Sequence, residues 1–163
     1  MNALRPFIAA AAALVLSPAG MAETWATFGF LSLHDQPGYN GENYGLGIEQ
    51  DVGERVAVVA GKYRNSRDLP SQYAGVTFAS PLTEGVDIAI TAGVVDGYPD
   101  DCDWKCRSSD PFDDSVPTRG PHPLLLPTIQ LNGQRFGANI ALAPPIGKDG
   151  ATAIAIQFKV RLR

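Results

Sequence analysis

The sequence predicts an all-β chain, an eight-stranded antiparallel up-and-down transmembrane β-barrel that follows a cleaved signal peptide. Three observations support this fold class. The N-terminal segment has the form of a secretory signal, and the rest consists of short apolar segments with a period of two, separated by Gly, Pro, Asn and Asp clusters. The links between these segments alternate between short and long, which is typical of outer-membrane barrels.

The first 22 residues are expected to be the signal peptide. Arg5 precedes an apolar run over residues 7–16, and small residues lead to Ala22. This run is shorter than the about 20 residues that a membrane-spanning helix needs. We therefore expect cleavage after Ala22 and a barrel domain over residues 23–163.

The charge of the mature chain argues against a nucleic-acid partner. Removing Arg5 from the 13 basic side chains leaves 12 against 17 acidic ones. No basic stripe remains to bind a phosphate backbone, so we expect no nucleic acid as a partner. We also expect no cofactor.

Both cysteines fall in one polar segment, residues 98–120. An exported chain meets oxidising conditions, so we predict a short-loop disulfide between Cys102 and Cys106. A metal site is the less favoured alternative, because zinc needs about four ligands and only His122 and several carboxylates are close in sequence. We therefore predict no metal.

The period-two segments predict eight strands, at residues 23–34, 43–52, 55–65, 71–80, 86–97, 123–132, 134–143 and 151–163. Tight turns are expected at Gly53-Glu54, from Leu82 to Gly85, and at Asn132-Gly133, since Asn-Gly is a strong hairpin signal. The remaining links are longer, at 35–42, 66–70, 98–122 and 144–150. The long-loop end is expected to face outside the cell.

The two faces of each predicted strand differ in size and polarity. The last strand carries bulky apolar residues on one face and Ala, Gln, Lys and Arg on the other. Gly and Ala weaken strands, whereas the lumen of an eight-stranded barrel is barely wide enough for side chains, so the small and charged face is assigned to the lumen. Trp25, Tyr44 and Tyr73 are expected on the lipid side as interfacial aromatics. A soluble barrel with its faces reversed is the alternative.

Charged side chains of both signs are predicted in the half of the lumen near the tight turns. Confined charges must pair or change protonation, so an ion-pair plug is expected there. The alternative is that these charges sit at strand ends in water. The residues are Glu49, Asp51, Asp87, Arg135, Lys159 and Arg161.

At the opposite rim the topology brings two strand ends together. His34 ends the first strand, and the sequence Tyr63-Arg64-Asn65-Ser66 ends the third. A histidine within reach of a serine is the minimum for nucleophilic or general-base acyl transfer, because serine needs a base to lose its proton. An ordinary polar loop is the alternative.

Four prolines predict a gap in the barrel wall. Pro123 and Pro127 lie in the upper half of the sixth strand, and Pro144 and Pro145 end the seventh at the same height. Proline cannot donate to a strand ladder. We predict an unpaired window that gives a lipid tail lateral access to the lumen, with a frayed rim as the alternative.

These segments resemble the outer-membrane lipid A palmitoyltransferase family, PagP. The sequence Pro121-His122-Pro123-Leu124-Leu125-Leu126-Pro127, followed by a hairpin and Ala143-Pro144-Pro145, is similar to the proline-flanked sixth and seventh strands of that family. Tyr63-Arg64-Asn65-Ser66, with Tyr73-Ala74-Gly75 after it, resembles the segment that carries the catalytic Asp-Ser pair. Tyr39-Asn40 before Tyr44-Gly45-Leu46-Gly47 fits the first loop and second strand. The resemblance covers most of residues 24–163.

The resemblance implies a lumen that holds a phospholipid acyl chain and transfers it to lipid A at the outer rim. Ser66 matches the catalytic serine, and Asn65 stands where the family has aspartate. Direct alignment puts Ala26 at the catalytic histidine, so His34 is reached by a shifted alignment. Tyr63 and Arg64 are expected to bind substrate, since a guanidinium suits a lipid phosphate.

The sequence therefore predicts an outer-membrane barrel of a Gram-negative bacterium, with phospholipid and lipid A as partners and His34, Asn65 and Ser66 as candidate catalytic residues. A non-enzymatic small outer-membrane barrel with a structural or lipid-binding role is the alternative.

Overall fold

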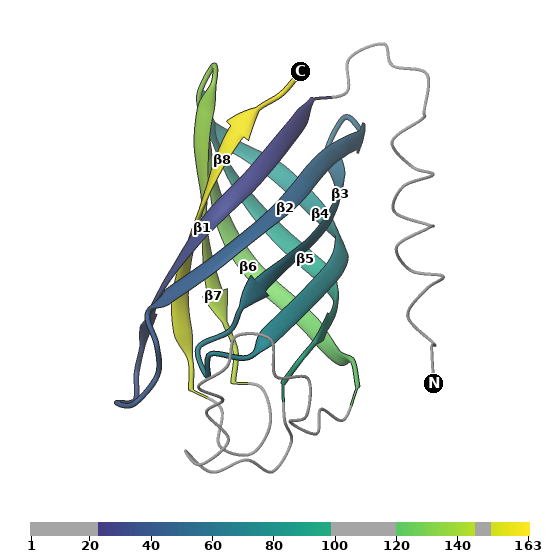
Figure 1. Cartoon of the computed structure of the whole chain (residues 1–163). Coiled ribbons are helices and arrows are strands. Elements are labelled where there is room, and N and C mark those ends of the chain that lie inside the picture. The colour runs from purple at the N-terminus through teal and green to yellow at the C-terminus, as the bar shows by residue number, and fades with distance from the viewer. Residues whose placement is uncertain (1–22, 99–119, 146–150) are drawn as a thin grey trace.

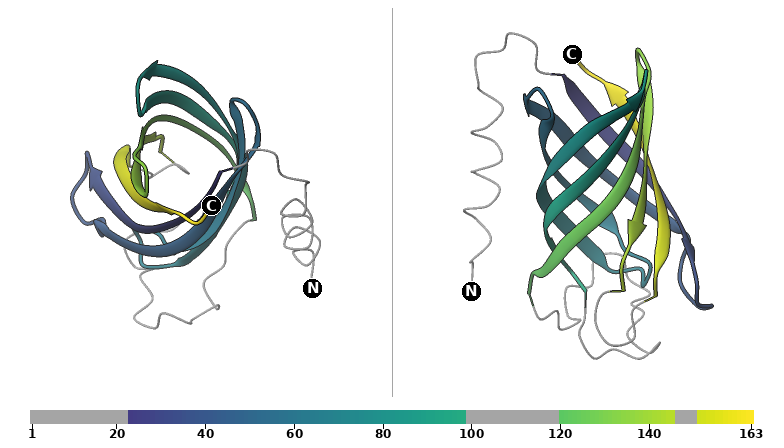
Figure 2. Two further views of the ribbon diagram at one scale, coloured as in Figure 1. Left: turned by 90° about the horizontal axis from the view of Figure 1, so that it is seen from above. Right: turned by 180° about the vertical axis from the view of Figure 1, so that it is seen from behind.

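The computed structural model describes residues 23–98, 120–145 and 151–163, which form a closed barrel of eight antiparallel strands (Figure 1). Each strand pairs with its neighbours in sequence, and β8 closes the barrel on β1. The view along the barrel shows strands around a central lumen (Figure 2). None of the described residues forms a helix long and apolar enough to cross a membrane. The predicted all-β fold, a barrel of eight antiparallel up-and-down strands, is confirmed.

All eight predicted strands are present, with ends shifted by a few residues at most. They are β1 (Thr24–His34), β2 (Glu42–Gly53), β3 (Val56–Arg64), β4 (Pro70–Thr83), β5 (Val86–Asp96), β6 (His122–Asn132), β7 (Phe136–Ala143) and β8 (Ala153–Arg161). The β2–β3, β4–β5 and β6–β7 turns are short and lie at one end of the barrel, and the longer links lie at the other (Figure 1). These ends are called the turn end and the loop end below.

The outer face of the barrel is apolar, as predicted. Leu46 is 73% exposed and Phe136 is 69% exposed. Glu49 and Lys159 are 4% and 1% exposed, inside the barrel. The faces are therefore oriented as predicted for a membrane barrel and not as in a barrel with an apolar interior.

The prediction of interfacial aromatics is correct only for Tyr44, which is 68% exposed. Trp25 points inward and is 2% exposed, with Lys159 Nζ 4.9 Å and Arg161 Cζ 4.7 Å from its ring centroid. Tyr73 also lies in the lumen, where it accepts a hydrogen bond from Gln157. The two rings fit inside because small residues on the lumen face leave space that an aromatic ring can fill.

The predicted plug is present in part. Lys159 Nζ lies 2.8 Å from Glu49 Oε1 inside the lumen. Arg161 instead pairs with Glu23 at 3.1 Å, close to the turn end. Arg135 was wrongly placed in the plug: it is exposed, because it falls in the β6–β7 turn rather than on a lumen-facing strand position.

Candidate functional site

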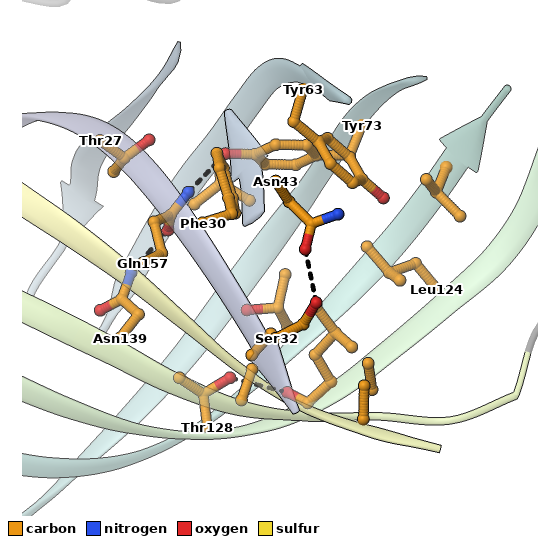
Figure 3. Close-up of a pocket in the computed structure, with 18 of the residues that line it drawn as sticks. Thr27, Phe30, Ser32, Asn43, Tyr63, Tyr73, Leu124, Thr128, Asn139 and Gln157 are labelled. Carbon is orange, nitrogen blue, oxygen red and sulfur yellow. Dashed lines mark hydrogen bonds between the residues drawn. The ribbon is translucent and has the colours of Figure 1, made fainter. Parts of the chain in front are cut away.

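The loop-end half of the lumen contains a cavity of about 160 Å³ (Figure 3). Part of its wall is apolar, formed by Phe30, Val59, Val95, Leu124, Leu126 and Ala141. Ser66 lines the same cavity together with Ser32 and Asn43, so the predicted nucleophile lies at its loop end. The cavity therefore joins an apolar channel to a polar rim.

Aromatic side chains form one side of this cavity. The ring centroids of Phe30 and Tyr63 are 5.2 Å apart and stacked, and Tyr73 meets Tyr63 edge-on at 6.0 Å. The Tyr63 hydroxyl is 2.8 Å from the hydroxyl of Tyr98, which follows β5. Burial raises the pKa of Tyr98 above its ordinary value, so this phenol stays protonated and able to donate.

The predicted His34 and Ser66 are brought together. His34 Nε2 lies 2.7 Å from Ser66 Oγ, across the gap between the end of β1 and the β3–β4 loop. This distance allows the imidazole to accept the hydroxyl proton. Among the described residues, no carboxylate oxygen is hydrogen-bonded to the His34 ring.

Tyr39 holds the imidazole from the other side. Its ring stacks on His34 with 5.0 Å between centroids and an interplanar angle of 19°. The Arg67 guanidinium carbon lies 5.9 Å from the Tyr39 ring centroid. Sequence reasoning did not assign a role to Tyr39 or Arg67, although Tyr39 stands in the loop that the family resemblance includes.

A bulge in β1 turns His34 toward the lumen. The register with both neighbouring strands shifts between Phe28 and Phe30, and Gly29 there has φ +60°. Phe28 is exposed on the outer wall, whereas Phe30 lines the cavity although it is two residues further on. The bulge thus reverses the alternation, and His34 follows Phe30 to the inner face. Positive φ favours glycine, which explains why the bulge occurs at Gly29.

Asn65 supports the loop and does not contact the side chain of Ser66 or His34. It is 0% exposed, and its amide nitrogen donates to Ser71 Oγ at 2.9 Å and to the Gly97 carbonyl at 3.0 Å. Its Oδ1 accepts from two backbone N–H groups, those of Arg67 and Leu69. These bonds fix the β3–β4 loop internally and tie it to β4 and to the segment after β5, so the side chain positions Ser66 through the backbone.

The two predicted substrate-binding residues differ in orientation. Tyr63 points into the lumen and lines the cavity. Arg64 follows it on the outward side, and its guanidinium donates to the Asp68 carbonyl within the β3–β4 loop. A phosphate at Arg64 would have to share the guanidinium with that carbonyl.

Asn40 and Asn43 connect the loops around the His34–Ser66 pair. The Asn40 backbone N–H donates to the Ser66 carbonyl at 2.8 Å, and its amide nitrogen donates to Asp68 Oδ1 at 2.8 Å. Asn43 is 4% exposed and donates to the Arg64 carbonyl at 3.0 Å. These bonds hold the first loop against the β3–β4 loop.

The β6–β7 ladder is incomplete at the loop end. It pairs Thr128–Asn132 with Gly137–Ala141 and stops there, although β6 remains paired with β5 as far as His122. On β6, Pro127 is the first residue beyond the last β6–β7 pair, Thr128 with Ala141. Pro144 directly follows β7 and lines the cavity. The wall therefore has an unpaired segment where the prolines predicted one. Its use by lipid stays a prediction.

Several predictions lie outside the described residues, namely the signal peptide at residues 1–22 and the disulfide between Cys102 and Cys106. Within residues 23–98, 120–145 and 151–163, no group of three or more His, Cys, Asp and Glu side chains is arranged to hold a metal ion.

The solved structures contain a barrel of similar form. The N-terminal β-barrel domain of Pseudomonas aeruginosa OprF matches with a TM-score of 0.57 over 85% of this chain and 97% of that domain. The fold is shared. Sequence identity is 13%, so the likeness shows the fold alone. No protein-family model matches the chain, and no curated protein matches it, so membership of the palmitoyltransferase family stays a proposal.

Proposed function

We propose that this chain is an outer-membrane barrel that transfers an acyl chain from a phospholipid to lipid A. The observation that carries this proposal is the 2.7 Å contact between His34 and Ser66 at the loop end of the lumen cavity. The likeness to the OprF barrel domain supports the fold on which the proposal depends.

The outer wall supports insertion in a bilayer. Exposed Leu, Ile and Phe side chains lie on every strand except β3. The closed ladder satisfies most backbone polar groups internally, which a bilayer requires. The long loops then face outward and place His34 and Ser66 near the outer leaflet, where lipid A lies.

The apolar part of the cavity suits an acyl chain. Val95, Leu124 and Leu126 line it beside the unpaired end of β6. A chain that passes between Pro127 and Pro144 would bring its ester group to the rim, because Ser66 lines the same cavity.

The chemistry is transesterification through Ser66. The hydroxyl oxygen attacks the ester carbonyl of the phospholipid while His34 Nε2 accepts its proton. The ester C–O bond then breaks, and the imidazolium returns the proton to the departing lysophospholipid oxygen. A lipid A hydroxyl then attacks the acyl-serine carbonyl while His34 accepts its proton. The bond between the carbonyl carbon and Ser66 Oγ breaks, and the imidazolium returns the proton to Oγ, which restores the serine.

The neighbouring residues have supporting roles in this proposal. Asn65 holds the loop that presents Ser66, Tyr39 fixes the plane of the imidazole, and Tyr63 forms the wall of the acyl site. Arg67, next to the Tyr39–His34 stack, is a second cation at the rim for a lipid phosphate, beside the Arg64 of the sequence prediction.

The test is lipid A mass spectrometry after incubation of the folded protein with phospholipid and lipid A in vesicles. Wild-type protein should add one acyl chain, and Ser66→Ala and His34→Ala should each lose this product. Ser80→Ala is the matched control, because Ser80 is exposed at the turn end. If the wild-type protein adds no chain, or if Ser66→Ala retains activity, the proposal is wrong.

A non-enzymatic barrel with a structural or lipid-binding role is the second candidate. It is favoured by the missing carboxylate: Asn65 stands at the aspartate position of the resembled family, and its side chain already makes four structural hydrogen bonds. Retention of a labelled phospholipid without any transfer would support this candidate.

A further inference from the structure

Asn43 is a buried amide in the wall of the loop-end cavity, one step further into the lumen than the His34–Ser66 pair (Figure 3). It is 4% exposed. Its side chain contacts the residues two positions before each member of the pair: Oδ1 accepts from Ser32 Oγ, and Nδ2 donates to the Arg64 carbonyl at 3.0 Å. These two contacts fix which end of the amide carries the N–H groups.

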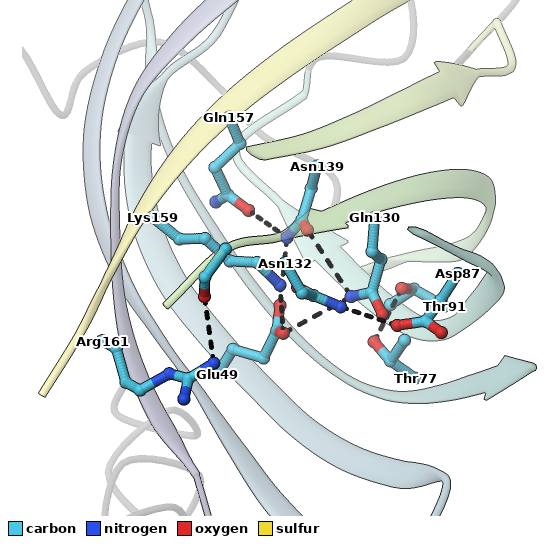
Figure 4. A network of polar contacts seen from close by, with 11 residues as sticks. Glu49, Thr77, Asp87, Thr91, Gln130, Asn132, Asn139, Gln157, Lys159 and Arg161 are labelled. Atoms are coloured by element: carbon cyan, nitrogen blue, oxygen red, sulfur yellow. Dashed lines mark hydrogen bonds and ion pairs between the residues drawn. The ribbon is translucent and has the colours of Figure 1, made fainter. Parts of the chain in front are cut away.

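One N–H group of this amide is unused. An amide nitrogen has two N–H groups, and the Arg64 carbonyl accepts from one of them. Within the part of the chain that the structure describes, the other has no hydrogen-bond partner. By contrast, Asn139 deeper in the lumen uses both groups, on Glu49 Oε2 at 3.0 Å and on Gln157 Oε1 at 3.2 Å (Figure 4). A buried donor without a partner is costly, so we expect a group bound in the cavity to accept from Asn43.

The backbone N–H of Ser66 is a second unused donor. No described residue accepts from it, whereas the N–H groups on either side are bonded. The N–H of Asn65 donates to the Leu69 carbonyl, and that of Arg67 donates to Asn65 Oδ1, both at 2.8 Å. Because it belongs to the same residue as Oγ, the Ser66 N–H stays close to any carbonyl that Oγ attacks. In serine proteases the N–H of the catalytic serine binds the oxyanion in this way.

We propose that the Asn43 amide and the Ser66 backbone N–H form the oxyanion hole of this site, which makes Asn43 a catalytic residue. This role depends on the acyl transfer proposed above. When Ser66 Oγ attacks the ester carbonyl, the π electrons of that carbonyl move to its oxygen, while His34 holds the proton of the hydroxyl. The two N–H groups donate to the negative oxygen until the carbonyl re-forms, the C–O bond to the lysophospholipid breaks and the imidazolium protonates the departing oxygen.

An oxyanion hole explains how the pair catalyses without a carboxylate on His34. Stabilisation of the developing charge is usually the largest single contribution to catalysis. Serine proteases that lack a member of the triad keep about 10³–10⁴-fold acceleration over water, from the oxyanion hole and substrate binding alone. The apolar part of the cavity wall strengthens both hydrogen bonds, because it excludes water from them.

The experiment measures acyl transfer in vesicles of phosphatidylethanolamine and lipid A, at several mole fractions of the phospholipid so that kcat and KM separate. Asn43→Leu and Asn43→Asp both remove the donor, and the second keeps an acceptor for Ser32. Each should lower kcat about 100- to 1000-fold and leave KM within about threefold, because the oxyanion is absent from the bound ground state. Asn43→Ala replaces either variant that fails to fold, as judged by heat-modifiable gel migration.

Asn40→Ala is the matched control. It removes a side-chain tie between the same two loops, the bond to Asp68 Oδ1, but Asn40 does not line the cavity. Its kcat should therefore stay within about threefold of wild type. A purely structural role of Asn43 predicts instead that both asparagine variants behave alike.

A second readout needs no lipid acceptor. Hexadecyl fluorophosphonate reacts when Ser66 Oγ displaces its fluoride, and the phosphoryl oxygen then takes the place of the oxyanion. Intact-protein mass spectrometry follows this labelling, which should be at least about tenfold slower in the folded Asn43 variants.

The outcomes separate the oxyanion hole from acyl transfer itself. If wild type transfers the chain and a folded Asn43 variant transfers and labels at the wild-type rate, or changes only KM, the role of Asn43 is refuted and the proposed function stands. If wild type labels at Ser66 but transfers nothing to lipid A, the proposed function is wrong and the labelling rates still decide on Asn43. If wild type does neither, both are wrong.

Discussion

Replacing Asn65 by aspartate tests whether the asparagine is a structural residue or a lost catalytic acid. The resembled family has aspartate at this position, so Asn65→Asp restores its sequence. The structure predicts that this change destabilises the loop and does not improve catalysis. The reason is that the Asn65 amide nitrogen donates to the Gly97 carbonyl at 3.0 Å, and a carboxylate oxygen cannot donate.

The magnitude follows from the four hydrogen bonds of this side chain. The bonds from the N–H groups of Arg67 and Leu69 survive the change, and the Ser71 hydroxyl can rotate to donate to the new carboxylate. The bond to Gly97 is lost, and its buried carbonyl then faces an oxygen. One lost bond plus an unsatisfied buried acceptor costs about 2–4 kcal/mol in free energy of unfolding.

The cost should depend on pH. Full burial and the facing Gly97 carbonyl favour the protonated carboxyl, which can donate to that carbonyl, whereas the N–H groups of Arg67 and Leu69 favour the charged form. We expect burial and the carbonyl to outweigh the two donors, so that the folded-state pKa lies above the about 3.9 of the unfolded chain. A raised folded-state pKa means that the protonated form stabilises the fold. The deficit is therefore smallest below about pH 4 and grows as the pH rises through the folded-state pKa.

The assay is urea unfolding in detergent micelles, followed by heat-modifiable gel migration, at pH 4 and pH 7.5. Ser71→Ala is the matched control: it removes one hydrogen bond of the same side chain, introduces no charge and should cost about 1 kcal/mol at both pH values. Equal stability of Asn65→Asp and wild type at pH 7.5, or a deficit that does not change with pH, would refute this reasoning. A gain in acyl transfer would show instead that the carboxyl reaches the catalytic pair.

Two glycine substitutions test the packing of the lumen by the same urea assay. Gly29→Ala should lower stability by about 1–2 kcal/mol, because φ is +60° at the bulge; an unchanged midpoint would contradict the bulge geometry. Gly61→Ala places a Cβ 2.7 Å from the Tyr73 ring, so the ring must move away from Gln157 at a cost of about 1–3 kcal/mol. Gly53→Ala is the control, since its Cβ would meet nothing nearer than 3.8 Å, and Gly61→Ala should cost clearly more.

The strands and their facing were predictable because alternation and turn chemistry are local signals. Asn132-Gly133 marks a hairpin on its own, and apart from the β1 bulge the outward Leu, Ile and Phe residues of each strand follow a period of two. The contact between His34 and Ser66 was also predictable, since an up-and-down topology brings the ends of β1 and β3 to the same rim.

The sequence could not show the features that depend on a break in the alternation of strand faces or on contacts between residues distant in sequence. The inward turn of Phe30 and His34 requires the bulge at Gly29, and glycine occurs in these strands for several other reasons. Trp25 looks like an interfacial aromatic until its neighbours across the β1–β8 seam, Lys159 and Arg161, are known. The role of Asn65 depends on a carbonyl 32 residues away.

The irregular features of the strands that do not adjoin a hairpin turn lie in the loop-end half, and this distribution supports placing the chemistry there. The other two strand register shifts, at Asp51/Gly53 and Pro81/Thr83, lie beside hairpin turns, where they close tight links. The bulge at Gly29 instead interrupts a long strand, and the β6–β7 ladder stops on the same, loop-end side of the Glu49–Lys159 ion pair. Natural sequences keep such departures from regular structure mainly where function requires them. The turn-end half is held by complete strand ladders and the Glu49–Lys159 ion pair, which leaves the loop-end half free to open toward lipid.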